Sequence, residues 1–168
     1  MRAAALALLI ATTPAFAARE GLEAVNYRPG WGFGFTLGDP FGLTLKHYLG
    51  GSQAWDLYAA FAYGPGIRFG GDWIWTLGRA VKARQLDLDV YVGAGPFLGS
   101  FRGPCGPGWL NNPCNGDLYF GGRVPFGAEM LFKEAPVSVG VELGPGIWFA
   151  PGGAQLFLDL AFVFRFLF

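Results

Sequence analysis

The chain has 168 residues, of which 52% are hydrophobic and 14% are charged. This apolar content excludes intrinsic disorder, and the 28 glycines and 12 prolines argue against a helical bundle because both residues destabilise helix interiors. The 12 basic and 12 acidic residues balance, so no basic patch indicates a nucleic-acid partner. The length suits one domain, and its apolar surplus requires either a large dry core or a lipid bilayer.

The N-terminal residues have the pattern of a secretory signal peptide. Arg2 precedes an unbroken apolar run over residues 3–11, and Ala15-Phe16-Ala17 provides an A-x-A cleavage site. The run is too short to cross a bilayer as a helix, which takes about 20 residues. We therefore predict a signal peptide over residues 1–17 and one mature domain over residues 18–168, rather than a buried N-terminal helix.

Eight later segments alternate apolar residues with other residues at a period of two, which predicts β-strands. The last segment is the clearest, because Phe164, Phe166 and Phe168 share one parity while Asp159 and Arg165 lie on the other. The eight segments are residues 31–38, 43–49, 55–63, 67–77, 86–94, 118–132, 137–143 and 155–168.

Most segments between these strands are rich in Gly, Pro, Asn and Asp, as turns require. Short turns are expected at residues 38–42, 50–52, 64–66 and 133–136. Longer connections are expected at residues 100–117 and 144–153, and a longer basic connection at residues 78–85. The connection over residues 100–117 contains Cys105 and Cys114. An exported chain meets an oxidising compartment, so we predict a disulfide between them.

Nearly all charge in the strands falls on one parity. These residues are Lys46, Asp56, Arg68, Asp72, Asp87, Asp89, Arg123, Glu129, Glu142, Asp159 and Arg165. A soluble sandwich or barrel would turn them to water, whereas a membrane barrel turns its polar face inward.

Three observations favour the membrane arrangement. Strands of about 9–11 residues fit a tilted bilayer crossing, the strand number is even, and the apolar parity is too bulky to fill a narrow interior. The fold prediction is an all-β, eight-stranded antiparallel up-and-down transmembrane β-barrel. The charged residues would form an interior network in which seven acids face four bases, so some acids must reach water or be protonated.

With both termini on the periplasmic side, the aromatic residues sort by height along the strands, as in the two aromatic girdles of membrane barrels. The periplasmic set is Trp31, Trp55, Trp73, Trp75, Phe132 and Phe166. The outer set is Phe61, Tyr63, Phe69, Trp148 and Phe149. A plain preference of aromatics for strands does not explain this sorting.

Several short motifs carry a resemblance to a known family. They are Gly32-x-Gly34, Gly38-Asp39-Pro40-Phe41-Gly42-Leu43-Thr44-x-Lys46-x-Tyr48, Tyr91-Val92-Gly93-x-Gly95, Arg123-Val124-Pro125-Phe126-Gly127, Leu131-Phe132-Lys133-x-Ala135-Pro136, Glu142-Leu143-x-Pro145 and the terminal alternating Phe. Over about residues 30–168, the chain resembles the small bacterial outer-membrane β-barrel proteins of unknown function and, more loosely, the OmpA/OmpX-type eight-stranded architecture. This resemblance implies a fold and a location in the cell outer membrane, but no activity.

The resemblance also implies an assembly signal at the C-terminus. In outer-membrane barrels, a terminal aromatic residue that follows alternating apolar residues is read by the insertion machinery, and Phe164, Phe166 and Phe168 match that pattern. The last strand must also pair with the first, because an open sheet edge in lipid leaves backbone groups without partners. The expected partners are therefore outer-membrane lipid and the insertion machinery, with the barrel itself a monomer.

The residues give no support for an enzyme, a metal site or a cofactor. The single histidine, His47, lies on the apolar parity near a strand end and is followed by Tyr48 and Leu49, and the mature serines are few (Ser52, Ser100 and Ser138). A catalytic triad needs a nucleophile and a base within reach of each other. Paired carboxylates such as Asp87 and Asp89 are better explained by internal salt bridges, and the two cysteines with Asn111 by a disulfide than by a metal site.

The function expected from the sequence is that of an integral outer-membrane barrel with a structural or surface-interaction role. A narrow ion-scale pore is one alternative, because many inward residues are glycine, although eight strands leave little room for a channel. A soluble periplasmic, lipocalin-like barrel that binds a small ligand is the other alternative. It requires the apolar parity to face a ligand cavity.

Overall fold

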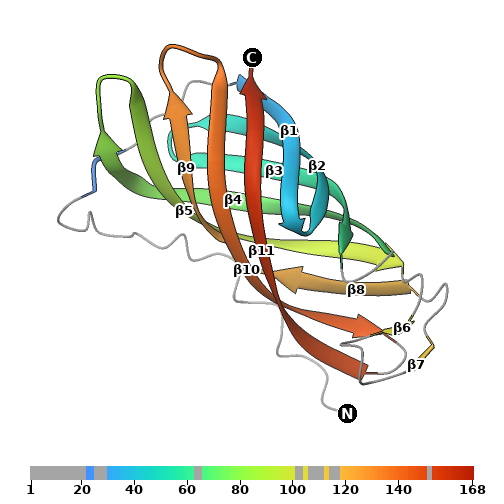
Figure 1. The fold of residues 1–168 in the computed structure, drawn as a ribbon. Helices are drawn as coiled ribbons and strands as arrows, with labels where there is room; N and C mark the ends of the chain where they lie inside the picture. The colour runs from blue at the N-terminus through green and yellow to red at the C-terminus, as the bar shows by residue number, and fades with distance from the viewer. Residues whose placement is uncertain are drawn as a thin grey trace.

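The computed structural model describes residues 22–24, 30–62, 66–100, 104–105, 112–113, 118–150 and 153–168 (Figure 1). The predicted signal peptide, residues 1–17, lies outside them. The strands are β1 (Gly30–Asp39), β2 (Phe41–Gly50), β3 (Gln53–Ala62), β4 (Gly66–Lys82), β5 (Leu86–Ser100), β6 (Pro104–Cys105), β7 (Asn112–Pro113), β8 (Leu118–Arg123), β9 (Phe126–Phe132), β10 (Val137–Ala150) and β11 (Gly153–Leu167). No helix in these residues is long and apolar enough to cross a membrane.

The large sheet closes into a ring of eight antiparallel strand positions (Figure 1). Neighbours in sequence are neighbours in the sheet, β8 and β9 together occupy one position between β5 and β10, and β11 closes the ring by pairing with β1. The prediction of an all-β antiparallel fold with eight strand positions is confirmed.

The strands of this ring are staggered. A walk along paired residues leads from Phe164 on β11 through Phe35 on β1 and onward around the sheet to Phe149 on β10, whose partner is Ala154. Ala154 lies ten residues before the starting point on the same strand. The stagger around the ring is therefore ten residues at about 3.4 Å each, and the circumference is eight strand spacings of about 4.8 Å each. The ratio of these two lengths corresponds to strands tilted by about 40° from the axis of the ring.

Two connections are shorter than the sequence suggests. The sequence predicts a loop over residues 144–153, but β10 continues to Ala150 and β11 begins at Gly153. β10 continues through Pro145 because this residue lies opposite the break between β8 and β9. Pro125 lies in that break and also lacks an N–H group, so the two missing hydrogen-bond donors are at the same place in the sheet. The Pro125 and Pro145 carbonyls still accept hydrogen bonds from Gly93 N and Val124 N, at 2.7 and 2.9 Å.

The second correction concerns residues 78–85, where the sequence predicts a basic connection. β4 instead runs to Lys82, with irregular pairing to β5 near Gly78 and again near Val81. Trp75 is the last residue of β4 that pairs with β3, so the edge of β4 beyond it is not covered by β3. Glu23 pairs with Arg79 on this edge. A Cβ at Gly78 would come within 2.6 Å of the Leu22 Cβ, so this N-terminal segment packs directly on the backbone there.

The two faces of the ring differ sharply in polarity. Large apolar side chains such as Phe33, Leu43, Phe69, Phe120 and Phe162 are 47–62% exposed on the outside. The inside contains charged side chains, tyrosines and glycines. A soluble sheet protein buries its apolar face, so this ring has the reverse distribution.

Aromatic rings and glycines pair across the inner wall. Tyr58 lies opposite Gly70, Tyr119 opposite Gly99, Tyr91 opposite Gly127 and Phe157 opposite Gly146. In each pair the aromatic ring occupies the place of the missing side chain, because a Cβ on the glycine would come within 2.2–2.4 Å of the ring's Cζ atom. The inward glycines therefore make room for rings that lie against the wall, instead of leaving an empty channel.

Candidate functional site

All eleven charged residues that the sequence assigns to one parity are buried in the ring, each 1–8% exposed. They come from β2, β3, β4, β5, β8, β9, β10 and β11, so every strand position except that of β1 contributes at least one. Buried charges are stable only when they are paired and hydrogen-bonded. Their contacts are the main feature of the interior.

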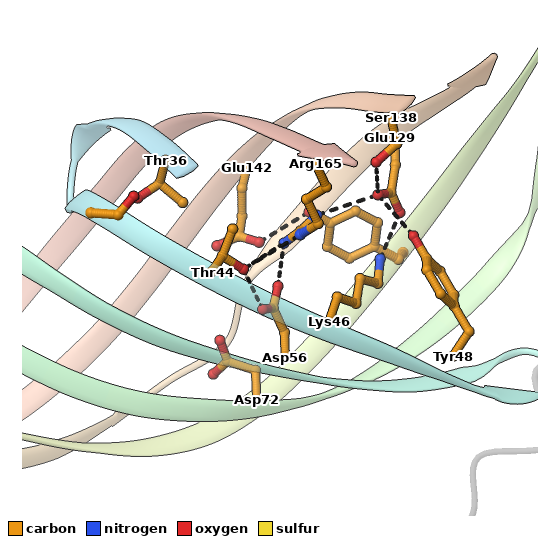
Figure 2. A network of polar contacts seen from close by, with 12 residues as sticks. Thr36, Thr44, Lys46, Tyr48, Asp56, Asp72, Glu129, Ser138, Glu142 and Arg165 are labelled. Carbon is orange, nitrogen blue, oxygen red and sulfur yellow. Dashed lines mark hydrogen bonds and ion pairs between the residues drawn. The ribbon is translucent and has the colours of Figure 1, made fainter. Parts of the chain in front are cut away.

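Glu129 is the centre of one group of contacts (Figure 2). Its Oε2 lies 2.6 Å from Lys46 Nζ, and its Oε1 accepts hydrogen bonds from Ser138 Oγ at 2.8 Å and Tyr48 Oη at 3.0 Å. Arg165 Nη1 lies 3.3 Å from the same Oε1. The carboxylate is thus held by two cations and two hydroxyl groups.

Arg165 extends this group across the ring (Figure 2). Its Nη2 forms an ion pair with Asp56 and also lies 3.2 Å from Thr44 Oγ1. The Thr44 hydroxyl donates in turn to Asp56 Oδ1 at 2.5 Å. One side chain from β11 thereby connects β2, β3 and β9 through the interior.

Arg123 forms a second group with three acids. Its guanidinium lies 2.5 Å from Asp72 Oδ2, 3.0 Å from Glu142 Oε1 and 3.4 Å from Asp159 Oδ2. The ring of Tyr58 lies 4.3 Å from the guanidinium carbon, a distance at which the aromatic face attracts the cation. Arg123 therefore holds together acids from β4, β10 and β11.

Arg68 lies in the interior beside Gly99, near the end of β5. Its Nη2 lies 2.5 Å from Asp159 Oδ2, and its guanidinium carbon is 5.1–5.6 Å from the ring centres of Tyr58, Phe97 and Phe157. Trp148 belongs to the same aromatic cluster and is only 7% exposed. The structure thus corrects the prediction that Trp148 lies in an outer girdle, because Trp148 continues the inward parity of Glu142 along β10.

Arg79 is a member of the interior network that the sequence does not predict. Its Nη1 lies 2.7 Å from Asp87 Oδ2 and its Nε lies 2.7 Å from Asp89 Oδ1, while Lys133 Nζ is 2.8 Å from Asp87 Oδ1. The irregular pairing at Gly78 shifts the parity of β4, so simple alternation gives the wrong side for Arg79. Arg79 and Lys133 supply two positive charges beyond the four that the sequence assigns to the interior against its seven acids. Gly78 is the one sign in the sequence of the change in parity at Arg79.

The charged groups that the structure describes enclose a small cavity. A cavity of about 10 Å³ lies among Thr36, Thr44, Asp56, Tyr58, Arg123, Glu142 and Arg165. Such a volume is close to the minimum for a single water molecule. Tyr58, whose buried Oη has no hydrogen-bond partner, is one of the lining residues. In the part of the chain that the structure describes, no three His, Cys, Asp or Glu side chains are grouped to hold a metal ion.

Two residues considered for catalysis lie apart. Ser138 is buried and donates its hydroxyl to Glu129, whereas His47 lies on the outer face of β2, where it stacks on Trp31. They therefore do not form a nucleophile–base pair. At the C-terminus, Phe166 and Phe168 are 55% and 76% exposed on the outside, and Phe164 packs against Phe35 and Phe166.

The predicted disulfide is described only in part. Cys105 lies in β6 opposite Asn112 of β7, and Cys114 is outside the described residues.

We expect mass spectrometry of the protein isolated from its native cells, alkylated without reduction, to show no free thiol. In the chain-entropy model, closing a loop of this size stabilises the folded state by roughly 2–3 kcal/mol, an effect confined here to the loop. The Cys105→Ser variant serves as the control for alkylation, since it must expose one thiol. Two alkylated cysteines in the parent protein would exclude the bridge.

Comparison of the chain with protein-family models, with curated proteins and with solved structures finds no match in any of the three.

Proposed function

We propose that this chain is an integral outer-membrane β-barrel with a sealed interior, whose role is structural or depends on its surface loops. The observation that supports this most strongly is the reversed polarity of the ring. Phe69, Phe120 and Phe162 point outward at 58–62% exposure, while Arg68, Asp89 and Asp159 are about 1% exposed inside. A continuous apolar surface of this kind indicates contact with a membrane or a partner.

The strands themselves are consistent with a membrane crossing. The ring has an even number of strand positions, and β1 to β3, its shortest complete strands, have ten residues each. A tilted transmembrane strand needs about 9–11 residues, and bacterial single-chain barrels have even strand numbers. The ring also leaves no open edge between β11 and β1 over residues 160–167, as a lipid environment demands.

The interior argues against the two alternatives. A lipocalin-like protein would need apolar side chains around a ligand cavity, but Leu43, Phe69 and Phe162 lie on the outside. An ion path would need continuous space along the axis. In the described residues, the interior instead contains the groups around Glu129 and Arg123 and the aromatic cluster at Arg68, which supports a sealed ring.

The direct test is refolding of residues 18–168 with and without detergent micelles or lipid vesicles. We expect a folded protein only with detergent or lipid, faster gel migration before boiling than after it, and no conductance steps in a planar bilayer. A monodisperse folded protein in buffer alone would refute membrane insertion. Stable conductance steps would refute the sealed interior while leaving the barrel assignment intact.

Deletion of Phe168 should reduce assembly more than stability. Phe168 is 76% exposed and follows the last residue of β11, so the deletion removes little packing and mainly the two backbone hydrogen bonds with Trp31. We expect less inserted protein in cell membranes, while the purified, refolded variant unfolds close to the parent. Normal insertion together with a collapse of stability would show that the terminus is a packing element instead.

A further inference from the structure

We propose that the outer face of β1–β5 binds one phospholipid, with its primary ammonium headgroup at His47 and its two acyl chains in adjacent grooves beside Leu57. This inference rests on the proposed function, because the outer face must lie in a bilayer. The inference goes beyond the proposed function, because contact with bulk lipid requires only apolar side chains. A specific lipid site also needs a polar group, here the imidazole beside indole rings.

An aromatic row crosses four neighbouring strands at one level of the sheet. Trp31 on β1 lies opposite His47 on β2, His47 opposite Trp55 on β3, and Trp55 opposite Trp73 on β4. The imidazole stacks on Trp31 with ring centres 4.2 Å apart, and Trp55 approaches the imidazole and Trp31 rings, at 5.4 and 5.2 Å. Tryptophan concentrates where a bilayer meets water, so this row marks the level of the headgroups.

The hydrogen bond of His47 fixes which ring nitrogen is available. Nδ1 lies 3.0 Å from the Gly30 carbonyl oxygen, which can only accept, so Nδ1 carries the hydrogen and donates. In the neutral form of the ring, Nε2 is then the acceptor nitrogen, on an imidazole that lies against the Trp31 and Trp55 rings. An acceptor beside indole rings complements a cation that can donate hydrogen bonds, and a primary ammonium group has both properties.

Two apolar grooves lie next to this row on the outer face. One has a volume of about 470 Å³ and is lined mainly by Trp55, Leu57, Gly71, Trp73, Ala94 and Pro96. The other has a volume of about 370 Å³ and lies mainly among Phe33, Leu43, Leu45, Leu57, Ala59 and Phe69.

The arrangement of these grooves matches a lipid with two hydrocarbon chains. Leu57 lines both, so they are neighbours separated by a single side chain, and Trp55 and Trp73 connect the first groove to the aromatic row. The first groove exists because Gly71 and Ala94 are small. A Cβ at Gly71 would already come within 2.7 Å of Leu57 Cδ2. A headgroup site that continues into two apolar grooves fits a diacyl phospholipid.

The experiment is a lipid-retention measurement on the refolded protein in detergent, read by native mass spectrometry. Dioleoyl phosphatidylethanolamine is compared with dioleoyl phosphatidylglycerol, which has the same chains and no ammonium group. We expect one retained phosphatidylethanolamine and about tenfold weaker retention of phosphatidylglycerol, the factor that about 1.4 kcal/mol of headgroup contacts produces.

Three variants separate the parts of the site. His47→Phe keeps the aromatic stack and removes the acceptor, so the preference between the two lipids should disappear. Ala94→Leu fills the first groove and should weaken both lipids. Ala128→Leu, the matched control, lies on the outer face of β9 opposite Val90 and Val141 and should bind as the parent does.

Several results would overturn the site. They are equal retention of the two lipids by the parent, an unchanged preference in His47→Phe, or an unchanged affinity in Ala94→Leu. Each of these could occur in a protein that still shows heat-modifiable migration, and the proposed function would then survive without the site. A protein that folds in buffer alone would instead refute the proposed function itself.

Discussion

Arg123→Ala should lower the unfolding free energy of the refolded protein by about 3–5 kcal/mol, the usual cost of removing one partner of a buried ion pair. The substitution leaves Asp72, Glu142 and Asp159 without their shared cation, and it also removes the contact with the Tyr58 ring. The loss should be visible as a lower urea midpoint in detergent.

The matched control for this experiment is Arg84→Ala. Arg84 is exposed in the turn between β4 and β5, and surface substitutions of this kind usually change stability by less than about 0.5 kcal/mol. Arg79 is unsuitable as a control, despite its place near the end of β4, because it pairs with both Asp87 and Asp89. Equal midpoints for the Arg123 and Arg84 variants would show that the interior network contributes little to stability.

Leu143→Arg should destabilise the protein in lipid vesicles by about 2–4 kcal/mol, as charged residues do at the lipid-facing midplane of a barrel. Leu143 lies in the middle of β10, is 43% exposed and is flanked by Phe126 and Leu160 on the neighbouring strands. In water the same change would place an arginine on an exposed surface, with an effect within about 0.5 kcal/mol. The loss of unfolding free energy therefore shows whether lipid or water surrounds the outer face of the ring.

Ala135→Arg is the matched control, because Ala135 is exposed in the turn between β9 and β10. At the level of the membrane interface, the cost of an arginine falls to about 0–1 kcal/mol. If both variants unfold as the parent does in vesicles, the outer face of β10 does not contact hydrocarbon.

The sequence predicts much of the strand arrangement, because alternation is a strong signal wherever one face of a sheet is polar. The positions of Asp87 and Asp89 follow from it directly. Alternation fails at Arg79, where the irregular pairing near Gly78 changes the parity, and Gly78 itself is the only sign of this change in the sequence. At Trp148 the alternation continues, but the surrounding glycines and prolines indicate a loop instead of a continuing strand.

The sequence predicts that the interior charges form a network, but it does not predict which residues contact one another. Thr44, Ser138 and Tyr48 complete the hydrogen bonding around Asp56 and Glu129, yet each is a common strand residue with no distinctive spacing. Their roles depend on the stagger of the strands around the ring, which brings Lys46 on β2 to Glu129 on β9. The stagger is set when the sheet closes into a ring, so it cannot be read from the sequence of any single strand.

The pairing of aromatic rings with glycines has a consequence for how the strands find their alignment. A hairpin that slips by two residues keeps every side chain on its proper face, so the alternating pattern does not oppose it. Such a slip would place Tyr58 against Arg68 or Asp72 instead of Gly70, and Tyr91 against Pro125 or Glu129 instead of Gly127. The ring of each tyrosine would then collide with a side chain. The glycines thus discriminate against the misaligned hairpins that hydrophobicity alone would accept.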